Sequence, residues 1–141
     1  LAELFRIDDH GAALRFVDAL FAERHWMRHP YAWGVRQTFR RPAMRALIER
    51  ARDEAFLRPD ELTGLPMPVQ LLWGGAEAIL PARHLEFFRR HLPPAADIVS
   101  PEDYGHAPFL DRSDDLALRI LRFAEEARRR TVRERAVATA A

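Results

Sequence analysis

Two short segments of this 141-residue chain have the composition of buried β-strands, and their small number constrains the fold most. They are residues 69–73 (VQLLW) and 96–100 (ADIVS), and a helical pattern at 81–91 separates them. A connection of this length implies parallel strands joined by a right-handed crossover. A two-stranded parallel sheet is marginal in water. We therefore expect the edge of a larger sheet, completed by another part of the protein or by a partner.

Helical patterns dominate the chain outside these strands. Residues 1–62 read as helices, with Asp8 as a candidate N-cap, a break at His29-Pro30 and a new helix opening at Pro42. After the Gly- and Pro-containing segment 63–68, the order is strand, helix, strand and a last helix capped by Ser113, with Leu116, Ile120, Phe123 and Ala127 facing inward. We expect a helical segment at 1–62, an α/β part at 63–127 and a disordered, Arg- and Ala-rich tail at 128–141.

Composition excludes several classes of function. The chain has 22 basic and 21 acidic residues, a balance that argues against a nucleic-acid partner. It has no cysteine, so a disulfide scaffold, a thiolate zinc site and a cysteine nucleophile are excluded. No apolar run reaches the ~18 residues of a membrane span. We expect a cytoplasmic protein, although its first residue is Leu1 and a preceding segment would change that expectation.

Two loops that follow the strands carry the residues best suited to chemistry. Glu77 lies in the loop after the first strand, and His106 lies after the second, between Gly105 and Pro108. Gly105 would allow a sharp turn, and Pro108 would stiffen the loop. Sites in parallel α/β sheets form at the carboxyl ends of strands, where these loops meet. A carboxylate beside an imidazole is the arrangement that orients a general base.

These residues resemble the C-terminal part of α/β-hydrolase fold enzymes. Residues 68–81 (PVQLLWGGAEAILP) resemble the stretch that carries the triad acid, and 105–111 (GHAPFLD) resembles the histidine motif. The resemblance implies a partial α/β-hydrolase fold, with 1–62 as a helical lid before a strand-helix-strand-helix end of a parallel sheet. It also implies that His106 is the triad histidine and Glu77 the triad acid, where the family more often has Asp.

The nucleophile of that family is absent from these 141 residues. The family's chain order is nucleophile, acid and histidine. There is no G-x-S-x-G motif, Ser100 lies between Glu77 and His106, and Ser113 follows both. No glycine-flanked Asp elbow replaces it. The resemblance therefore implies a fragment that lacks the nucleophile half and is inactive by itself.

The resemblance implies a hydrolase of small, hydrophobic, ester-like substrates with no cofactor. Trp26 and Trp33 belong to an aromatic-rich part of the lid and are candidates for a wall of the substrate pocket, the alternative being packing between lid and core. His25 and His29 have the spacing of a helical metal pair, but Trp26 stands where a metalloprotease needs Glu and Pro30 follows directly. We therefore expect no metal site.

Two other functions stay open. One is a non-catalytic α/β binding module, and the other is a fragment of a dehalogenase or epoxide hydrolase whose nucleophile is Asp. The coding sequence upstream of Leu1 separates them, because it would contain G-x-S-x-G, G-x-D-x-G or neither motif.

Overall fold

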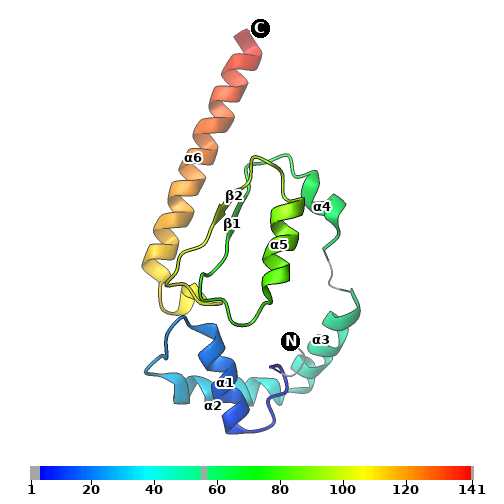
Figure 1. Ribbon diagram of the computed structural model, residues 1–141, viewed down its shortest axis with the longest axis vertical. Coiled ribbons are helices and arrows are strands. Elements are labelled where there is room, and N and C mark those ends of the chain that lie inside the picture. Colours follow the sequence, from blue (N-terminus) through cyan, green and yellow to red (C-terminus); the bar gives the residue numbers. More distant parts are fainter. Residues whose placement is uncertain (1–3, 55–56, 141) are drawn as a thin grey trace. The chain divides into compact units, whose positions relative to one another are not determined.

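The computed structural model describes residues 4–54 and 57–140, which form two compact units, Leu1–Ala107 and Pro108–Ala141. The division at residues 62 and 63 into a helical lid and an α/β part stays a prediction. In chain order (Figure 1), the elements are α1 (His10–Leu20), α2 (Arg28–Phe39), α3 (Pro42–Glu54), α4 (Pro59–Thr63), β1 (Gln70–Leu72), α5 (Ala82–His91), β2 (Asp97–Val99), the 3₁₀ helix η1 (Pro108–Leu110) and α6 (Ser113–Ala140).

Local chemistry fixes where the first two helices begin. Asp9, not Asp8, is the N-cap of α1, since its backbone is extended and its Oδ1 accepts the Ala12 N–H at 2.7 Å. The expected break at His29-Pro30 is also wrong, because α2 begins at Arg28 and both residues lie in its first turn. Proline is tolerated there, since the first N–H groups of a helix have no intrahelical acceptor. The start of α3 at Pro42 is confirmed.

The core of the first unit is formed mainly by α1 and α2, which pack against each other in Figure 1. Phe16 contacts Phe5 edge-on at a centroid distance of 5.6 Å and Phe39 at 5.3 Å. Ile79, from the loop after β1, is 7% exposed and joins the same core. This contact explains why the N-terminal helices and the sheet segment belong to one unit. The buried members of this core are Ile7, Ala13, Phe16, Val17, Phe21, Ala32 and Ile79.

The two strands are parallel, as the sequence predicts, with α5 between them in the chain. Leu71 is in register with Ile98. Asp97, the polar residue inside the second strand, accepts a hydrogen bond from the Gln70 side chain on β1 at 2.7 Å. Neither strand and no part of α5 contains a fully buried residue. Within residues 4–54 and 57–140 the sheet has two strands, so its apolar groups are only partly covered.

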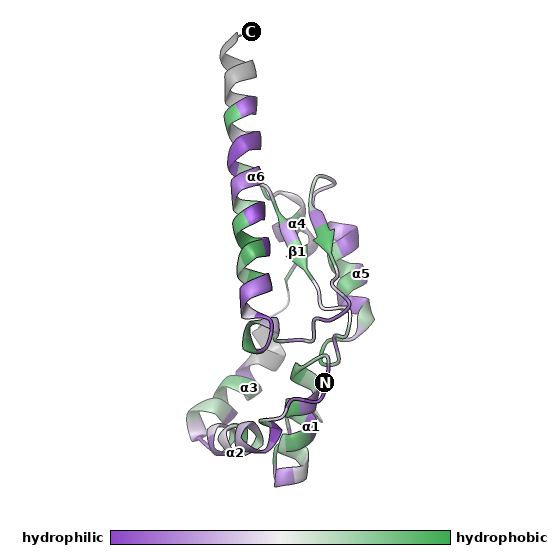
Figure 2. Ribbon diagram, turned by 90° about the vertical axis from the view of Figure 1, so that its left-hand side faces the viewer, coloured by the Kyte–Doolittle hydropathy of each residue, from purple (hydrophilic) through white to green (hydrophobic). Residues whose placement is uncertain are grey.

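The second unit is η1 followed by the long helix α6. The structure continues this helix to Ala140, whereas the sequence predicts a disordered tail from residue 128. Arg and Ala are strong helix formers, and Arg129 donates to Glu125 one turn earlier at 2.5 Å. Ile120, expected to face inward, is 55% exposed, like its neighbours Leu118 and Leu121. Figure 2 shows that the hydrophobic residues of α6 are concentrated in its N-terminal half, where they alternate with hydrophilic ones, and that the following turns are mostly hydrophilic.

The helices of the described segments differ from membrane spans. Among residues 4–54 and 57–140, no helix combines the length and the apolar character needed to cross a bilayer.

Candidate active site

Glu77 is held rigidly in the loop after β1. A turn closes this loop, with the Glu77 N–H donating to the Gly74 carbonyl at 3.2 Å. The carboxylate Oε1 accepts two backbone hydrogen bonds, from the N–H groups of Ile79 at 2.6 Å and Leu80 at 3.0 Å. The side chain is only 8% exposed. Because one oxygen is occupied by the loop itself, the direction of the other oxygen is fixed.

That other oxygen contacts His106. Nδ1 of the His106 ring lies 2.7 Å from Oε2 of Glu77. A carboxylate is an acceptor, so this contact places the ring proton on Nδ1 and leaves the lone pair on Nε2. The His106 side chain is one-third exposed, while Glu77 is nearly buried. The pair thus has a protected acid and an accessible base, although 29 residues separate them in the chain.

Backbone hydrogen bonds join the two loops that carry this pair. The Gly75 N–H donates to the Pro101 carbonyl at 2.8 Å, and the Ala76 N–H donates to the Tyr104 carbonyl at 3.0 Å. The Tyr104 side chain is fully buried. These contacts keep the loop after β1 and the loop after β2 side by side. Sequence reasoning did not identify Tyr104, because an isolated tyrosine in a loop carries no signal of burial.

Glycines allow the backbones to approach closely around the site. A Cβ on Gly74 would lie 2.3 Å from the Gly105 carbonyl oxygen, and a Cβ on Gly105 would lie 2.6 Å from the Leu20 carbonyl oxygen. Neither glycine has a positive φ, so no left-handed backbone conformation accounts for glycine at Gly105. Its role is to let the loop contact the end of α1. The Ala107 N–H completes this contact by donating to the Leu20 carbonyl at 3.0 Å.

The two candidate tryptophans of the helical segment lie at the surface. Trp26 is 84% exposed and Trp33 is 65% exposed. Packing of these rings between lid and core stays the alternative, since most of that core lies outside the 141 residues. A role in substrate binding stays a prediction. The neighbouring rings are buried more deeply, since Phe21 is 3% exposed and stacks on His25 at 4.5 Å.

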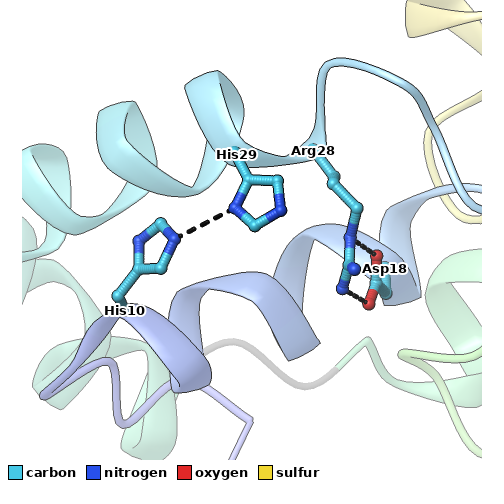
Figure 3. Close-up of polar contacts among 4 residues, drawn as sticks. All are labelled: His10, Asp18, Arg28 and His29. Carbon is cyan, nitrogen blue, oxygen red and sulfur yellow. Dashed lines mark hydrogen bonds and ion pairs between the residues drawn. The ribbon is translucent and has the colours of Figure 1, made fainter.

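His25 and His29, four residues apart, have different partners. The Nδ1 of His25 accepts the Met27 N–H at 3.1 Å. His29 instead contacts His10 of α1, with 3.3 Å between His29 Nδ1 and His10 Nε2 (Figure 3). No group of three or more His, Asp or Glu side chains able to hold a metal occurs in the part of the chain that the structure describes.

Neither serine belongs to the Glu77–His106 pair. Ser100 is exposed directly after β2, and Ser113 begins α6 in the other unit. The described residues thus provide an acid and a base, and the sequence contains no nucleophile elbow.

Comparison with known proteins identifies esterases and other hydrolases as relatives, while no family model matches. The chain is 37% identical over 59 residues to a pimeloyl-acyl-carrier protein methyl ester esterase of Aromatoleum aromaticum, covering 42% of this chain and 23% of that protein. For the same-named esterase of Neisseria meningitidis, identity is 38% over 64 residues, covering 45% of this chain and 25% of that protein. The chain thus matches about a quarter of the length of each curated relative.

Solved structures extend the likeness to most of the chain. A 2-hydroxy-6-oxo-6-phenylhexa-2,4-dienoate hydrolase from Rhodococcus superposes with a TM-score of 0.68 at 16% identity, over 83% of this chain and 44% of that chain. A membrane phospholipase A, described as a bacterial virulence factor, gives 0.69 at 20% identity, over 86% and 40%. Together with the parallel β1–β2 pair, these findings show that the chain has a partial α/β-hydrolase fold, as the sequence motifs predict.

Proposed function

We propose that this chain supplies the acid and the histidine of an α/β-hydrolase active site that cleaves an ester or a similar bond. One observation carries the proposal: the 2.7 Å contact between Glu77 Oε2 and His106 Nδ1. It supports the proposal because it fixes the tautomer that a general base needs, with the lone pair on Nε2. The esterase and hydrolase names of the relatives agree with this chemistry.

In this mechanism His106 moves the proton and Glu77 holds the ring. Nε2 of His106 accepts the proton of a serine hydroxyl as that oxygen attacks the carbonyl, and then donates it to the leaving group. Glu77 stabilises the imidazolium that forms between these steps, without taking its proton. The backbone N–H groups of Ile79 and Leu80 keep the carboxylate in place throughout. The serine comes from outside the 141 residues.

An Asp nucleophile would use the same pair differently. Asp needs no deprotonation by His106, so the ring would instead activate the water that hydrolyses the covalent intermediate. The names of the relatives, two ester hydrolases and a phospholipase, favour serine chemistry. Small hydrophobic esters are therefore the proposed substrates, with Trp26 and Trp33 as the proposed apolar contacts.

The proposal is tested with p-nitrophenyl esters of short acyl chains. The 141-residue chain should release no more p-nitrophenol than its His106→Ala variant, because the nucleophile is absent. In a protein that joins this chain to a G-x-S-x-G segment, His106→Ala should lower kcat by at least ~10³-fold, since loss of a triad member removes most of the catalysis. His84→Ala on α5 is the matched control and should retain activity. Turnover by the 141-residue chain that depends on His106 would contradict the proposed source of the nucleophile.

A non-catalytic binding module is the second candidate, and the exposure of Trp26 and Trp33 favours it. If the protein acts in this way, a Trp26→Ala variant should lose binding to its partner, whereas His106→Ala should have no effect on any function.

A further inference from the structure

His10 and His29 form a pair of imidazoles that is separate from the candidate active site. His10 is the first residue of α1, and His29 lies in the first turn of α2. Their rings lie edge to edge in Figure 3, with a centroid distance of 5.6 Å and an angle of 21° between the ring planes. Both residues are exposed, so ions in solution can reach them.

The distance between the facing nitrogens is the one that a shared metal ion requires. His10 Nε2 and His29 Nδ1 are 3.3 Å apart. Imidazole nitrogens bind Zn²⁺ at about 2.0–2.1 Å, so two of them on a tetrahedral ion lie about 3.3–3.4 Å from each other. For a metal ion to take the place of the hydrogen between these two nitrogens, the exposed rings must rotate. The helices need not move.

The helices beneath the rings are held together independently of any ion. Arg28, next to His29, donates through Nε to Asp18 Oδ1 of α1 at 2.8 Å and through Nη2 to Oδ2 (Figure 3). Both side chains are partly buried. Val17, on the same helix as His10, is fully buried. The two histidines are thus presented by a preorganised helix pair, which lowers the entropy cost of binding an ion between them.

From this geometry we propose that His10 and His29 bind a divalent transition-metal ion of the Zn²⁺ class. Neutral imidazole suits Zn²⁺, Ni²⁺ and Cu²⁺, whereas Mg²⁺ and Ca²⁺ prefer oxygen ligands. No third side-chain ligand joins the pair among the described residues, so water completes the coordination. The ion would link α1 to α2, and α1 in turn contacts the His106 loop through Leu20 and Ala107.

Calorimetric titration of the 141-residue chain with ZnCl₂, and separately with NiCl₂, tests this site. We expect one ion per chain and a rise in the melting temperature with metal concentration. Because both imidazoles act on one ion, His10→Gln and His29→Gln should each weaken binding by roughly 10²-fold. His84→Gln and His91→Gln, two histidines on α5, are matched controls and should bind as the wild type does.

Electron paramagnetic resonance of the Cu²⁺ complex identifies the nitrogen ligands of the ion directly. The spectrum should show two coordinated imidazole nitrogens in the wild type and one in each single variant. Circular dichroism of the metal-free variants establishes that they keep the fold. Unchanged Zn²⁺ affinity in both folded single variants, or no binding by the wild type above the His10→Gln/His29→Gln double variant, would overturn the proposal.

Discussion

Glu77 uses its two carboxylate oxygens for different purposes. Oε1 accepts the N–H groups of Ile79 and Leu80, and Oε2 contacts His106. The first set of contacts holds the loop, and the second orients the ring. Substitution of this residue therefore changes stability as well as any activity, and the two effects can be separated by the choice of variant.

Replacing Glu77 by Ala should destabilise the chain. Two backbone N–H groups beside this nearly buried carboxylate would lose their acceptor, at a cost of about 1–3 kcal/mol in the free energy of unfolding. Glu77→Gln keeps one oxygen for the loop and should cost less. Urea denaturation measures both, with Glu102→Ala, an exposed neighbour, as the control. Equal stability of the Ala and Gln variants would argue against the structural role of Oε1.

Two glycines make a matched pair of tests for close backbone packing. At Gly105 an added Cβ would lie 2.5 Å from the Phe21 carbonyl carbon, whereas at Gly34, inside α2, it would meet nothing within 4 Å. Gly105→Ala should therefore cost at least ~1–3 kcal/mol of unfolding free energy, since backbone would have to move. Gly34→Ala should stabilise α2 by about 0.5–1 kcal/mol. Urea denaturation gives both values, and a neutral Gly105→Ala would contradict the packing described.

At the scale of elements, the sequence predicted the α/β half well. The short apolar runs became β1 and β2, the order strand-helix-strand-helix is as expected, and the glycines and prolines between them mark real ends of elements. The Glu77–His106 contact was implied by the family motifs. The strands and helices depend on residues that are close together in the chain. The Glu77–His106 contact joins residues further apart, but each of them lies in a recognisable motif.

Elements that depend on distant contacts were not predicted. The contact of α1 with Gly105 and the meeting of His10 with His29 join residues on different elements, and no spacing in the chain reveals them. The extent of α6 was underestimated for another reason. Its C-terminal residues have no regular apolar stripe, which is the main sequence signal of a helix, although Arg and Ala have high helix propensity.

The Glu125–Arg129 pair on α6 should make this helix sensitive to acid. The hydrogen bond and the charge of Arg129 hold the pKa of Glu125 below its usual value. A carboxylate with a lowered pKa stabilises the helix at neutral pH, and that contribution is lost as the pH falls through the lowered pKa. After correction for the intrinsic pH dependence of exchange, the protection factors of the amides around Arg129 should therefore fall in acid, and more strongly at low salt.

Two variants at neighbouring positions, Glu125→Gln and Glu126→Gln, test this prediction. Glu125→Gln should show less of the acid effect, whereas Glu126→Gln changes the same charge without touching the Glu125–Arg129 contact. If both variants respond to acid as the wild type does, the ion pair makes no contribution to α6.

At the scale of the whole molecule, apolar surface is left uncovered. Several large apolar side chains are more than half exposed, and neither strand has a fully buried residue. We expect the isolated 141-residue chain to bind the dye ANS strongly, or to self-associate. Dye fluorescence and sedimentation measure these properties. A monomer that binds no ANS and melts in one sharp transition would argue against an incomplete sheet. The exposed set includes Trp26, Trp33, Leu47, Phe109, Leu118, Ile120 and Leu121.

The hydrogen bond from Ala107 to Leu20 also has a consequence for folding kinetics. Its two residues are separated by more than half of the chain, and the His106 loop is held on one side by this contact. Closing so long a loop is entropically costly, and contacts of this kind slow the search for the native state. The helix pair α1–α2 can form earlier from nearby residues. The acid–histidine pair is therefore expected to assemble last, so that the rate at which this chain acquires its active-site geometry is set by its longest loop closure.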